Sequence, residues 1–181
     1  MDPLALIHKY YPAHSAARDI LITHSRAVTQ KALNIVKNNP QLKADVTFIE
    51  ESAMLHDIGI YLTRSPSIDC TGDSPYICHG YLGREILERE GFPRHALVCE
   101  RHVGTGISLQ EIIDQKLPLP KRDMCPCSIE EEIICYADKF FSKNQNSLSR
   151  KKSHEQIRSG LLPYGTEKVD QFDRWAEIFV D

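Results

Sequence analysis

The sequence predicts an all-α fold, and three observations lead to it. Apolar residues recur at spacings of three and four along most of the chain, as they do on the buried face of a helix. No segment alternates apolar and polar residues for long, so extended strands are not expected. Serine, proline and glycine residues divide the chain into lengths typical of helices. With 181 residues the chain can bury one continuous core, so we expect a single domain.

The first half of the chain is expected to form helices separated by proline and glycine. The expected segments are a short docking helix before Pro12, a long helix over 15–38, a central helix over 46–59, a loop over 63–75, a helix over 76–90 and a helix opened by Pro93. Gly91 stands where a glycine commonly ends a helix, and Pro93 stands where proline fits a first turn. These breaks define the predicted helix lengths.

The second half contains three serines that predict helix starts. Each serine is followed three residues later by Glu or Gln, the spacing of a capping box: Ser108 with Glu111, Ser128 with Glu131, and Ser153 with Gln156. The proline-rich stretch over 117–127 should be an irregular loop. We expect a core over about 15–144 and a helical extension over about 153–180. The extension carries Phe172, Trp175 and Phe179 in a stripe, which predicts core packing or a homodimer contact.

Charge and composition exclude several classes of function. The formal net charge of −3 argues against a general binder of nucleic acids or membrane surfaces, since such proteins carry a basic excess. No apolar run approaches the length of a membrane-spanning helix, and the N-terminus does not resemble a signal peptide. We therefore expect a cytoplasmic protein. A small anionic substrate stays compatible with this charge if a metal supplies positive charge locally.

The stretch AMLHDIGIY, residues 53–61, places an imidazole and a carboxylate side by side after an apolar run. Ala53 and His56 or Asp57 continue the apolar stripe of the central helix, so the pair should be buried. Burying these two groups without partners would cost several kcal/mol. A metal held between the two side chains would satisfy both.

Six polar residues fall on helix faces that are otherwise apolar: His24, His56, Asp57, His79, His102 and Asp138. Imidazole and carboxylate groups suit iron, manganese, zinc, nickel or cobalt. Six protein ligands exceed what one catalytic ion uses, because such an ion keeps a position open for water. The set therefore fits two metals better than one.

These residues resemble the HD-domain superfamily of metal-dependent phosphohydrolases. The resemblance is carried by His24, the HDIG string over 56–59 and Asp138 within CYADKFF, in the order that the family shows. Two further histidines, His79 in ICHGYLG and His102 in ERHVGTG, match the subset with a dinuclear centre. The resemblance covers about 15–144 and implies an HD-domain helical bundle.

The resemblance also implies a role for each residue. His24, His56 and Asp138 would hold one metal, His79 and His102 the other, and Asp57 would bridge them. It implies two divalent or trivalent ions, with iron first and manganese, nickel, cobalt or zinc as alternatives. Asp57 and His56 would stand at the catalytic centre, where a water shared by the metals attacks phosphorus.

HDIGIYLT and ERHVGTGIS look most like bacterial hydrolases that split diadenosine tetraphosphate symmetrically, which implies a nucleotide or another small phosphorylated substrate. The sequence departs from that group at Ile60, where a lysine is usual, and in a longer loop between His102 and Asp138. The substrate is therefore left open. The candidate phosphate-binding residues are Arg64, Arg101, Lys139, and Lys121 or Arg122.

Two other functions are compatible with the same residues. Some HD-fold proteins with this six-residue pattern use a di-iron pair to activate oxygen, and a sequence shows ligands but not redox state. An HD fold can also bind a nucleotide as a signal without turning it over. Phosphate release under anaerobic conditions with manganese would argue against the di-iron oxygenase. Turnover of any ligand would argue against a non-catalytic nucleotide-binding module.

Overall fold

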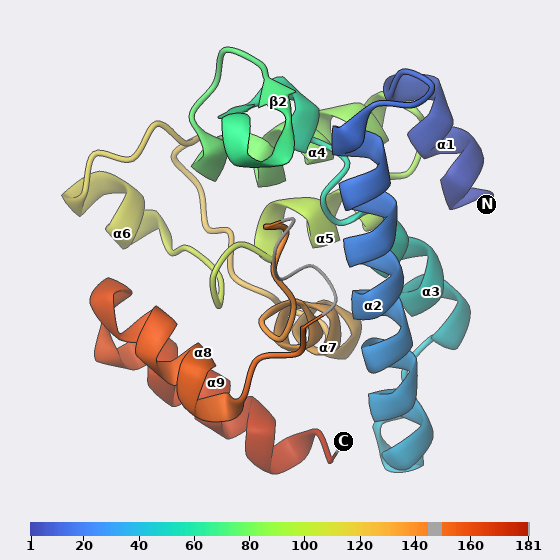
Figure 1. Ribbon diagram of the computed structural model, residues 1–181. Helices are drawn as coiled ribbons and strands as arrows, with labels where there is room; N and C mark the ends of the chain where they lie inside the picture. The colour runs from blue at the N-terminus through green and yellow to red at the C-terminus, as the bar shows by residue number, and fades with distance from the viewer. Residues whose placement is uncertain (145–149, 181) are drawn as a thin grey trace.

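The computed structural model describes residues 1–144 and 150–180 and folds them mainly into helices (Figure 1). The α-helices are α1 (Pro3–Tyr10), α2 (Ala16–Asn38), α3 (Val46–Leu55), α4 (His79–Arg89), α5 (Pro93–Arg101), α6 (Leu109–Asp114), α7 (Ile129–Asp138), α8 (His154–Leu161) and α9 (Thr166–Ile178). Short 3₁₀ helices are η1 (Pro40–Leu42), η2 (Ile60–Leu62), η3 (Pro66–Ile68), η4 (Tyr76–Cys78) and η6 (Leu162–Tyr164). The predicted all-α class is confirmed.

Two predictions about segments between the helices are wrong. The central helix, α3, ends at Leu55 rather than at Gly59, because the chain tightens into turns in which Ile58 N–H donates to Leu55 O and Ile60 N–H to Asp57 O. The segment over 63–75 is not a plain loop. It forms a two-stranded antiparallel hairpin of β1 (Arg64–Ser65) and β2 (Cys70–Thr71), with η3 between the strands.

The predicted serine caps are present, but one box is incomplete. Ser108 with Glu111 and Ser153 with Gln156 each form both bonds of a capping box. Ser128 accepts from Glu131 N–H as expected. The Glu131 carboxylate, however, accepts from Cys127 N–H and from Arg101, so this helix start is tied to α5 rather than closed on itself.

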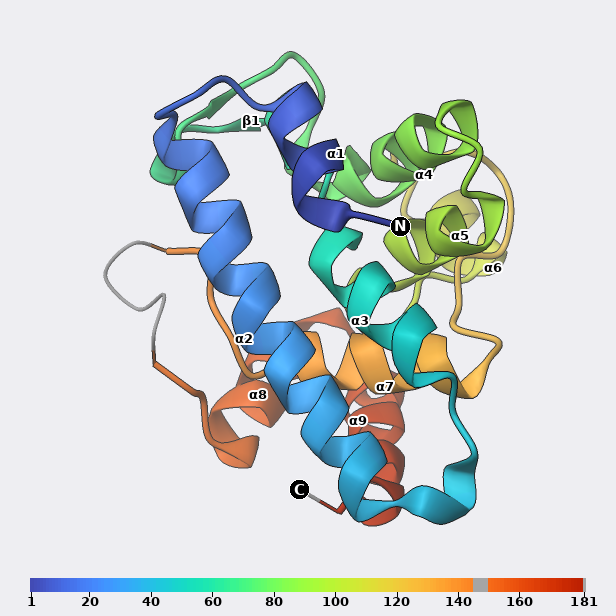
Figure 2. The same ribbon diagram turned by 90° about the vertical axis from the view of Figure 1, so that its right-hand side faces the viewer.

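The apolar core has two large clusters, and three helices contribute to both. One cluster contains residues of α7, α8 and α9, and the other contains residues of α1, the hairpin and α4. Helices α2, α3 and α5 supply side chains to each. Helix α1 packs on α3, and α2 packs on both α3 and α7 (Figure 2). In the described part of the chain, no helix has the length and apolar character needed to cross a bilayer.

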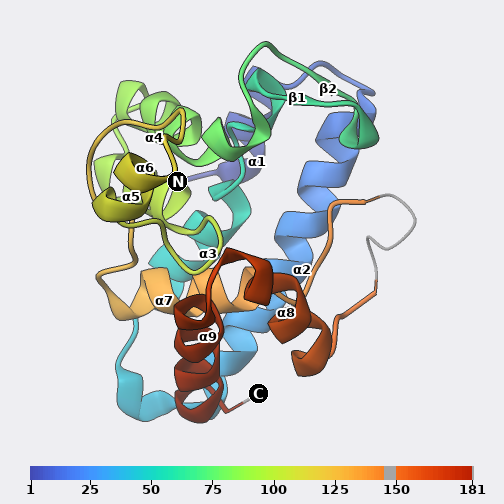
Figure 3. The ribbon, with the colours of Figure 1, turned by 90° about the vertical axis from the view of Figure 1, so that its left-hand side faces the viewer.

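The C-terminal helices belong to the core. Helices α8 and α9 lie side by side, and α9 packs on α7, on the far side of the molecule from α4 (Figure 3). Phe172, Trp175 and Phe179 are almost fully buried, and the Phe172 ring stacks on Tyr136 with centroids 5.2 Å apart. The stripe is therefore core packing. The alternative that it forms a dimer contact is wrong, because the chain itself covers it.

Candidate metal centre

Three of the predicted histidines lie at helix ends. His56 is the C-cap residue of α3, His79 of η4 and His102 of α5. Carbonyls in the last turn of a helix lack an N–H partner within the helix. Each histidine ring adds an N–H donor by donating Nδ1–H, at 2.7 Å, to the carbonyl three residues earlier: Ala53, Tyr76 and Cys99 respectively. Tyr76 O also accepts the backbone N–H of His79. With Nδ1 bonded in this way, the Nε2 atom of each ring faces the candidate metal centre and can bind a metal ion when it carries no proton.

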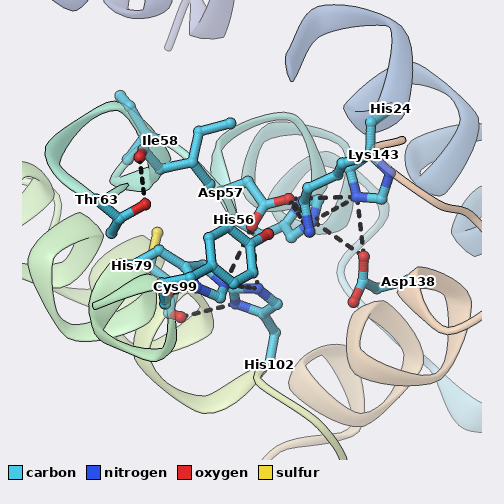
Figure 4. Close-up of polar contacts among 12 residues, drawn as sticks. His24, His56, Asp57, Ile58, Thr63, His79, Cys99, His102, Asp138 and Lys143 are labelled. Atoms are coloured by element: carbon cyan, nitrogen blue, oxygen red, sulfur yellow. Dashed lines mark hydrogen bonds and ion pairs between the residues drawn. The ribbon is translucent and has the colours of Figure 1, made fainter. Parts of the chain in front are cut away.

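A first cluster brings together His24, His56, Asp57 and Asp138. His24 Nε2 lies 2.9 Å from Asp138 Oδ1 and 3.3 Å from Asp57 Oδ2. His56 Nε2 lies 3.0 Å from the same Asp57 oxygen and 3.4 Å from Asp138 Oδ1. Side chains from α2, the end of α3 and α7 therefore converge on one point (Figure 4).

A second cluster contains Asp57, His79 and His102. Both histidine Nε2 atoms lie 3.3 Å from Asp57 Oδ1 and 3.2 Å from each other (Figure 4). Since each ring already donates its Nδ1–H to a backbone carbonyl, two lone pairs face each other at that distance. Such a pair repels unless a cation lies between the two nitrogens.

Asp57 belongs to both clusters and presents a different oxygen to each. Its side chain is fully buried, and among the described residues neither oxygen has a hydrogen bond of acceptable geometry, although Lys143 Nζ lies 2.7 Å from Oδ2. A buried carboxylate in this position needs positive charge to compensate its desolvation. The donor set of imidazole nitrogens and carboxylate oxygens, with oxygens that lack hydrogen bonds, fits divalent or trivalent metal ions.

The charges of the cluster also favour cations. Burial lowers the pKa of His56, but attraction to Asp57 and Asp138 outweighs it and raises that pKa to about 9. Burial alone would raise the pKa of Asp57, yet the charges of Lys143 and His56 hold it well below its ordinary value. Burial lowers the pKa of His79 to about 3, so this ring stays neutral and keeps a free lone pair.

The sequence matches a known family over the region that builds these clusters. The family model described as the HD domain matches residues 21–142. The chain belongs to the HD-domain family. Its fold is similar to the HD domain of the phosphodiesterase PgpH from L. monocytogenes, with a TM-score of 0.53, 16% identity and coverage of 94% of this chain and 92% of that one.

Relatives of this HD domain include longer proteins. The chain is 34% identical over 178 residues to a protein of Thermoplasma volcanium named tRNA (cytidine(56)-2'-O)-methyltransferase, covering 98% of this chain and 46% of that protein. It is 32% identical to a Picrophilus torridus protein of the same name, covering 79% of this chain and 43% of that protein. It is 36% identical to an uncharacterised Methanocaldococcus jannaschii protein, covering 65% of this chain and 64% of that protein. The chain thus spans a little under half of the first two proteins and about two thirds of the third.

Gly59 allows the turn over residues 56–59, called the HD turn from here on, to contact α4 closely. A Cβ atom added at Gly59 would lie 2.3 Å from His79 O and 2.5 Å from Gly83 N, both backbone atoms. The turn therefore approaches the start of α4 at a distance that only glycine permits. This approach brings Asp57, in the turn after α3, and His79, at the start of α4, into one cluster. Tyr11 supports the turn from the other side by donating its hydroxyl to Ile58 O at 2.9 Å.

Lys143 is a residue of the site that the sequence analysis missed. Its Nζ lies 2.7 Å from Asp57 Oδ2, and its side chain is 14% exposed (Figure 4). Attraction to Asp57 outweighs burial and raises the pKa of Lys143 well above its ordinary value. It follows Asp138 by five residues in a polar segment, where a lysine looks like an ordinary surface residue. Its contact could be recognised only from the folded chain.

The predicted phosphate-binding residues lie in different surroundings. Lys139 Nζ lies 2.9 Å from Asp138 Oδ2 and donates to His102 O, so it borders the centre. Arg101 donates to both oxygens of Glu131. Arg64 is exposed on β1, 3.6 Å from Asp73, and Arg122 is bonded to Glu100. Their roles toward a substrate stay predictions.

Proposed function

We propose that this HD domain is a phosphohydrolase with two metal ions, acting on a nucleotide or another small phosphate ester or anhydride. The observation that carries the proposal is Asp57, a fully buried carboxylate that presents one oxygen to each of two clusters of imidazoles. His24, His56 and Asp138 would hold one ion, and His79 and His102 the other. The fold likeness to a phosphodiesterase HD domain agrees with this class of chemistry.

The residues of the chain would have distinct tasks in such a reaction. Ions bound at the two clusters would supply a water polarised for attack on phosphorus and would neutralise charge on the phosphoryl oxygens. The backbone carbonyls of Ala53, Tyr76 and Cys99 would keep the three imidazoles in a fixed orientation. Lys143 and Lys139 would hold the anionic substrate, since both ammonium groups border the centre.

Metal content and phosphate release test the proposal together. The protein is purified without a metal-affinity tag, its metals are measured by mass spectrometry, and the same sample is assayed for phosphate release. We expect about two metals per chain and turnover of at least one phosphorylated substrate. Two irons per chain without phosphate release would instead favour the di-iron oxygenase. Metal-free protein with phosphate release would contradict the proposal.

A pair of variants separates the centre from the rest of the protein. Asp57→Ala should abolish turnover and lower the metal content while the helical circular dichroism is kept. His95→Gln is the matched control: this histidine is largely buried and pairs with Glu51 outside both clusters, so its loss should leave metal content unchanged. An active Asp57→Ala protein would overturn the assignment.

The names of two relatives suggest a different reaction, methyl transfer to tRNA. The chain spans less than half of each of these proteins, and the buried imidazole and carboxylate groups suit metal ions better than a methyl donor. We therefore propose hydrolysis for this domain and include RNA among its substrates to be tested. The panel contains mononucleotides with 2′-, 3′- and 5′-phosphates, cyclic phosphates, diadenosine tetraphosphate and phosphorylated tRNA ends. Methyl transfer from S-adenosylmethionine is measured in parallel.

A further inference from the structure

A cavity of about 380 Å³ adjoins the second cluster. His79 forms part of its wall, and so does Tyr76, whose ring stacks on the His79 ring with centroids 4.6 Å apart. The remaining walls come from the segment over 103–107, from α6 and from the C-terminal helices. Figure 1 shows α6 and the α8–α9 pair on the same side of the molecule. The cavity therefore connects the HD core to the C-terminal extension.

The lining of this cavity is mainly apolar and carries a few polar groups. Ile77, Val103, Ile107, Leu117 and Leu161 form its apolar walls. Glu111, Gln115 and Lys168 add a carboxylate, an amide and an ammonium group. This combination is typical of small-molecule sites, where apolar walls provide affinity and a few polar groups set orientation.

The wall between α6 and α9 is fixed by a buried ammonium group. Lys168 Nζ donates to Gly106 O at 2.8 Å and lies 2.6 Å from Glu111 Oε1. Gly106 adopts a φ of 95°, and a Cβ atom there would lie 2.8 Å from Cys125 Cα, so only glycine fits this turn. The Lys168 contacts and the Gly106 turn therefore hold this wall of the cavity in a defined conformation.

We infer that this cavity binds the organic group of the phosphate ester and that this group is a single nucleoside. The inference rests on the proposed hydrolase function, which places the phosphate beside Asp57 and His79. The base would lie between the apolar walls, with Tyr164, 69% exposed at the cavity, available for stacking. A volume of 380 Å³ is near the lower end of about 300–1,000 Å³ for small-molecule sites and suits one nucleoside rather than two.

The inference distinguishes between classes of nucleotide. A mononucleotide would occupy the cavity fully with its phosphate at the metal centre. A dinucleoside polyphosphate would leave its second nucleoside outside the cavity. We therefore expect mononucleotides to bind more tightly than the corresponding sugar phosphates. A second nucleoside should add little to the affinity.

Binding is tested first in the metal-free protein, so that the result does not depend on turnover. The probes are the four ribonucleoside 5′-monophosphates, their 3′ isomers, and ribose 5-phosphate as the matched probe without a base. Methyl NMR spectra should show shifts at Val103, Ile107, Leu117 and Leu161 with at least one mononucleotide and much smaller shifts with ribose 5-phosphate. Mononucleotides that leave these methyl signals unchanged would overturn the inference.

Variants of the wall then test the site in the metal-loaded protein. Leu117→Trp should fill the cavity and raise the KM for mononucleotides at least about 10-fold. Leu162→Trp is the matched control, since Leu162 is 57% exposed and does not line the cavity. Tyr164→Ala, at an exposed position that should not affect folding, should raise the same KM about 5-fold through lost stacking.

The outcomes separate the inference from the proposed function. Mononucleotide binding at the methyl groups of these four residues without hydrolysis of any substrate would support the cavity and overturn the hydrolase. Hydrolysis of mononucleotides with an unchanged KM in both Leu117→Trp and Tyr164→Ala would support the hydrolase and overturn the inference. Equal KM values for Leu117→Trp and Leu162→Trp would also overturn it.

Discussion

Lys143 contributes positive charge to a centre that otherwise holds two buried carboxylates, Asp57 and Asp138. Its replacement, Lys143→Met, should lower kcat by roughly 10²-fold, the usual effect of removing one preorganised donor to a reacting anion. It should also lower the thermal stability of the metal-free protein, because Asp57 then loses its nearest ammonium. Steady-state kinetics and thermal unfolding measure the two effects.

Lys37→Met is the control for this change, since Lys37 is exposed near the end of α2. It should alter neither kcat nor melting temperature. If Lys143→Met kept full activity, the ammonium would not be a substrate contact. A loss of stability that persists unchanged in the metal-loaded protein would show that Lys143 stabilises the fold and is not replaced by metal charge.

Gly59 provides a second test at single-residue scale. Gly59→Ala forces a Cβ atom to within 2.5 Å of backbone atoms of α4, so the HD turn or α4 must shift. We expect a loss of several kcal/mol in unfolding free energy, comparable to severe overpacking of a core, and a loss of metal. Calorimetry and metal analysis measure both.

Gly160→Ala, within a helix, should stabilise the protein, in contrast to Gly59→Ala. A Cβ atom at Gly160 would meet no atom of the described residues within 4 Å, and the residue lies in α8. Alanine should stabilise the protein here by about 0.5–1 kcal/mol, because glycine is a poor helix former. If Gly59→Ala and Gly160→Ala changed the unfolding free energy equally, the close approach of the turn to α4 at Gly59 would be contradicted.

The sequence predicted the six clustered residues because each lies on an apolar face or in a motif that resembles the family. It missed Lys143, which follows α7 without helical periodicity. It also placed Asp57 inside a helix, whereas the structure puts it in the turn after α3. The side chains at a helix end depend on contacts with α4 and α1, and local spacing does not encode those contacts.

Helix starts were predicted more accurately than the segments between helices. Serine caps act through local hydrogen bonds, so Ser108 and Ser153 could be recognised from neighbours in sequence. The β1–β2 hairpin has strands of only two residues, too short to show alternation. Further backbone bonds, from Gly72 N–H to Thr63 O and from Arg64 N–H to Ser74 O, hold this segment together, and backbone bonds leave no pattern in the sequence.

Helix α9 provides the prediction at the scale of an element. Trp175 is almost fully buried in the cluster with α7, so Trp175→Ala should cost about 3–5 kcal/mol in unfolding free energy. Ile178→Ala, on the same helix but 48% exposed, should cost much less. Denaturant unfolding measures both values. Equal small losses would mean that α9 is a detachable extension rather than part of the core.

The two clusters of the centre occupy the junction between the two large core clusters of the molecule. On α2, Leu21 belongs to one core cluster and Val28 to the other, with His24 between them. On α5, Val98 and Cys99 are divided in the same way just before His102. Ions at this junction would bind side chains from both halves of the core. Metal should therefore stabilise the whole fold rather than one loop.

Metal removal tests this coupling. A ligand that binds only the folded state stabilises it by about 2.7 kcal/mol at 100 times its Kd, and each kcal/mol raises the melting temperature of a domain of this size by about 2–4 °C. Chelation followed by return of manganese should thus raise the melting temperature by roughly 5–11 °C. The Asp57→Ala variant should show almost no rise, because the residue shared by both clusters is gone, whereas His95→Gln should respond like the unaltered protein. A similar rise in all three proteins would place the metal elsewhere, and no rise in any of them would mean that Lys143 and protonated His56 already compensate the buried carboxylates.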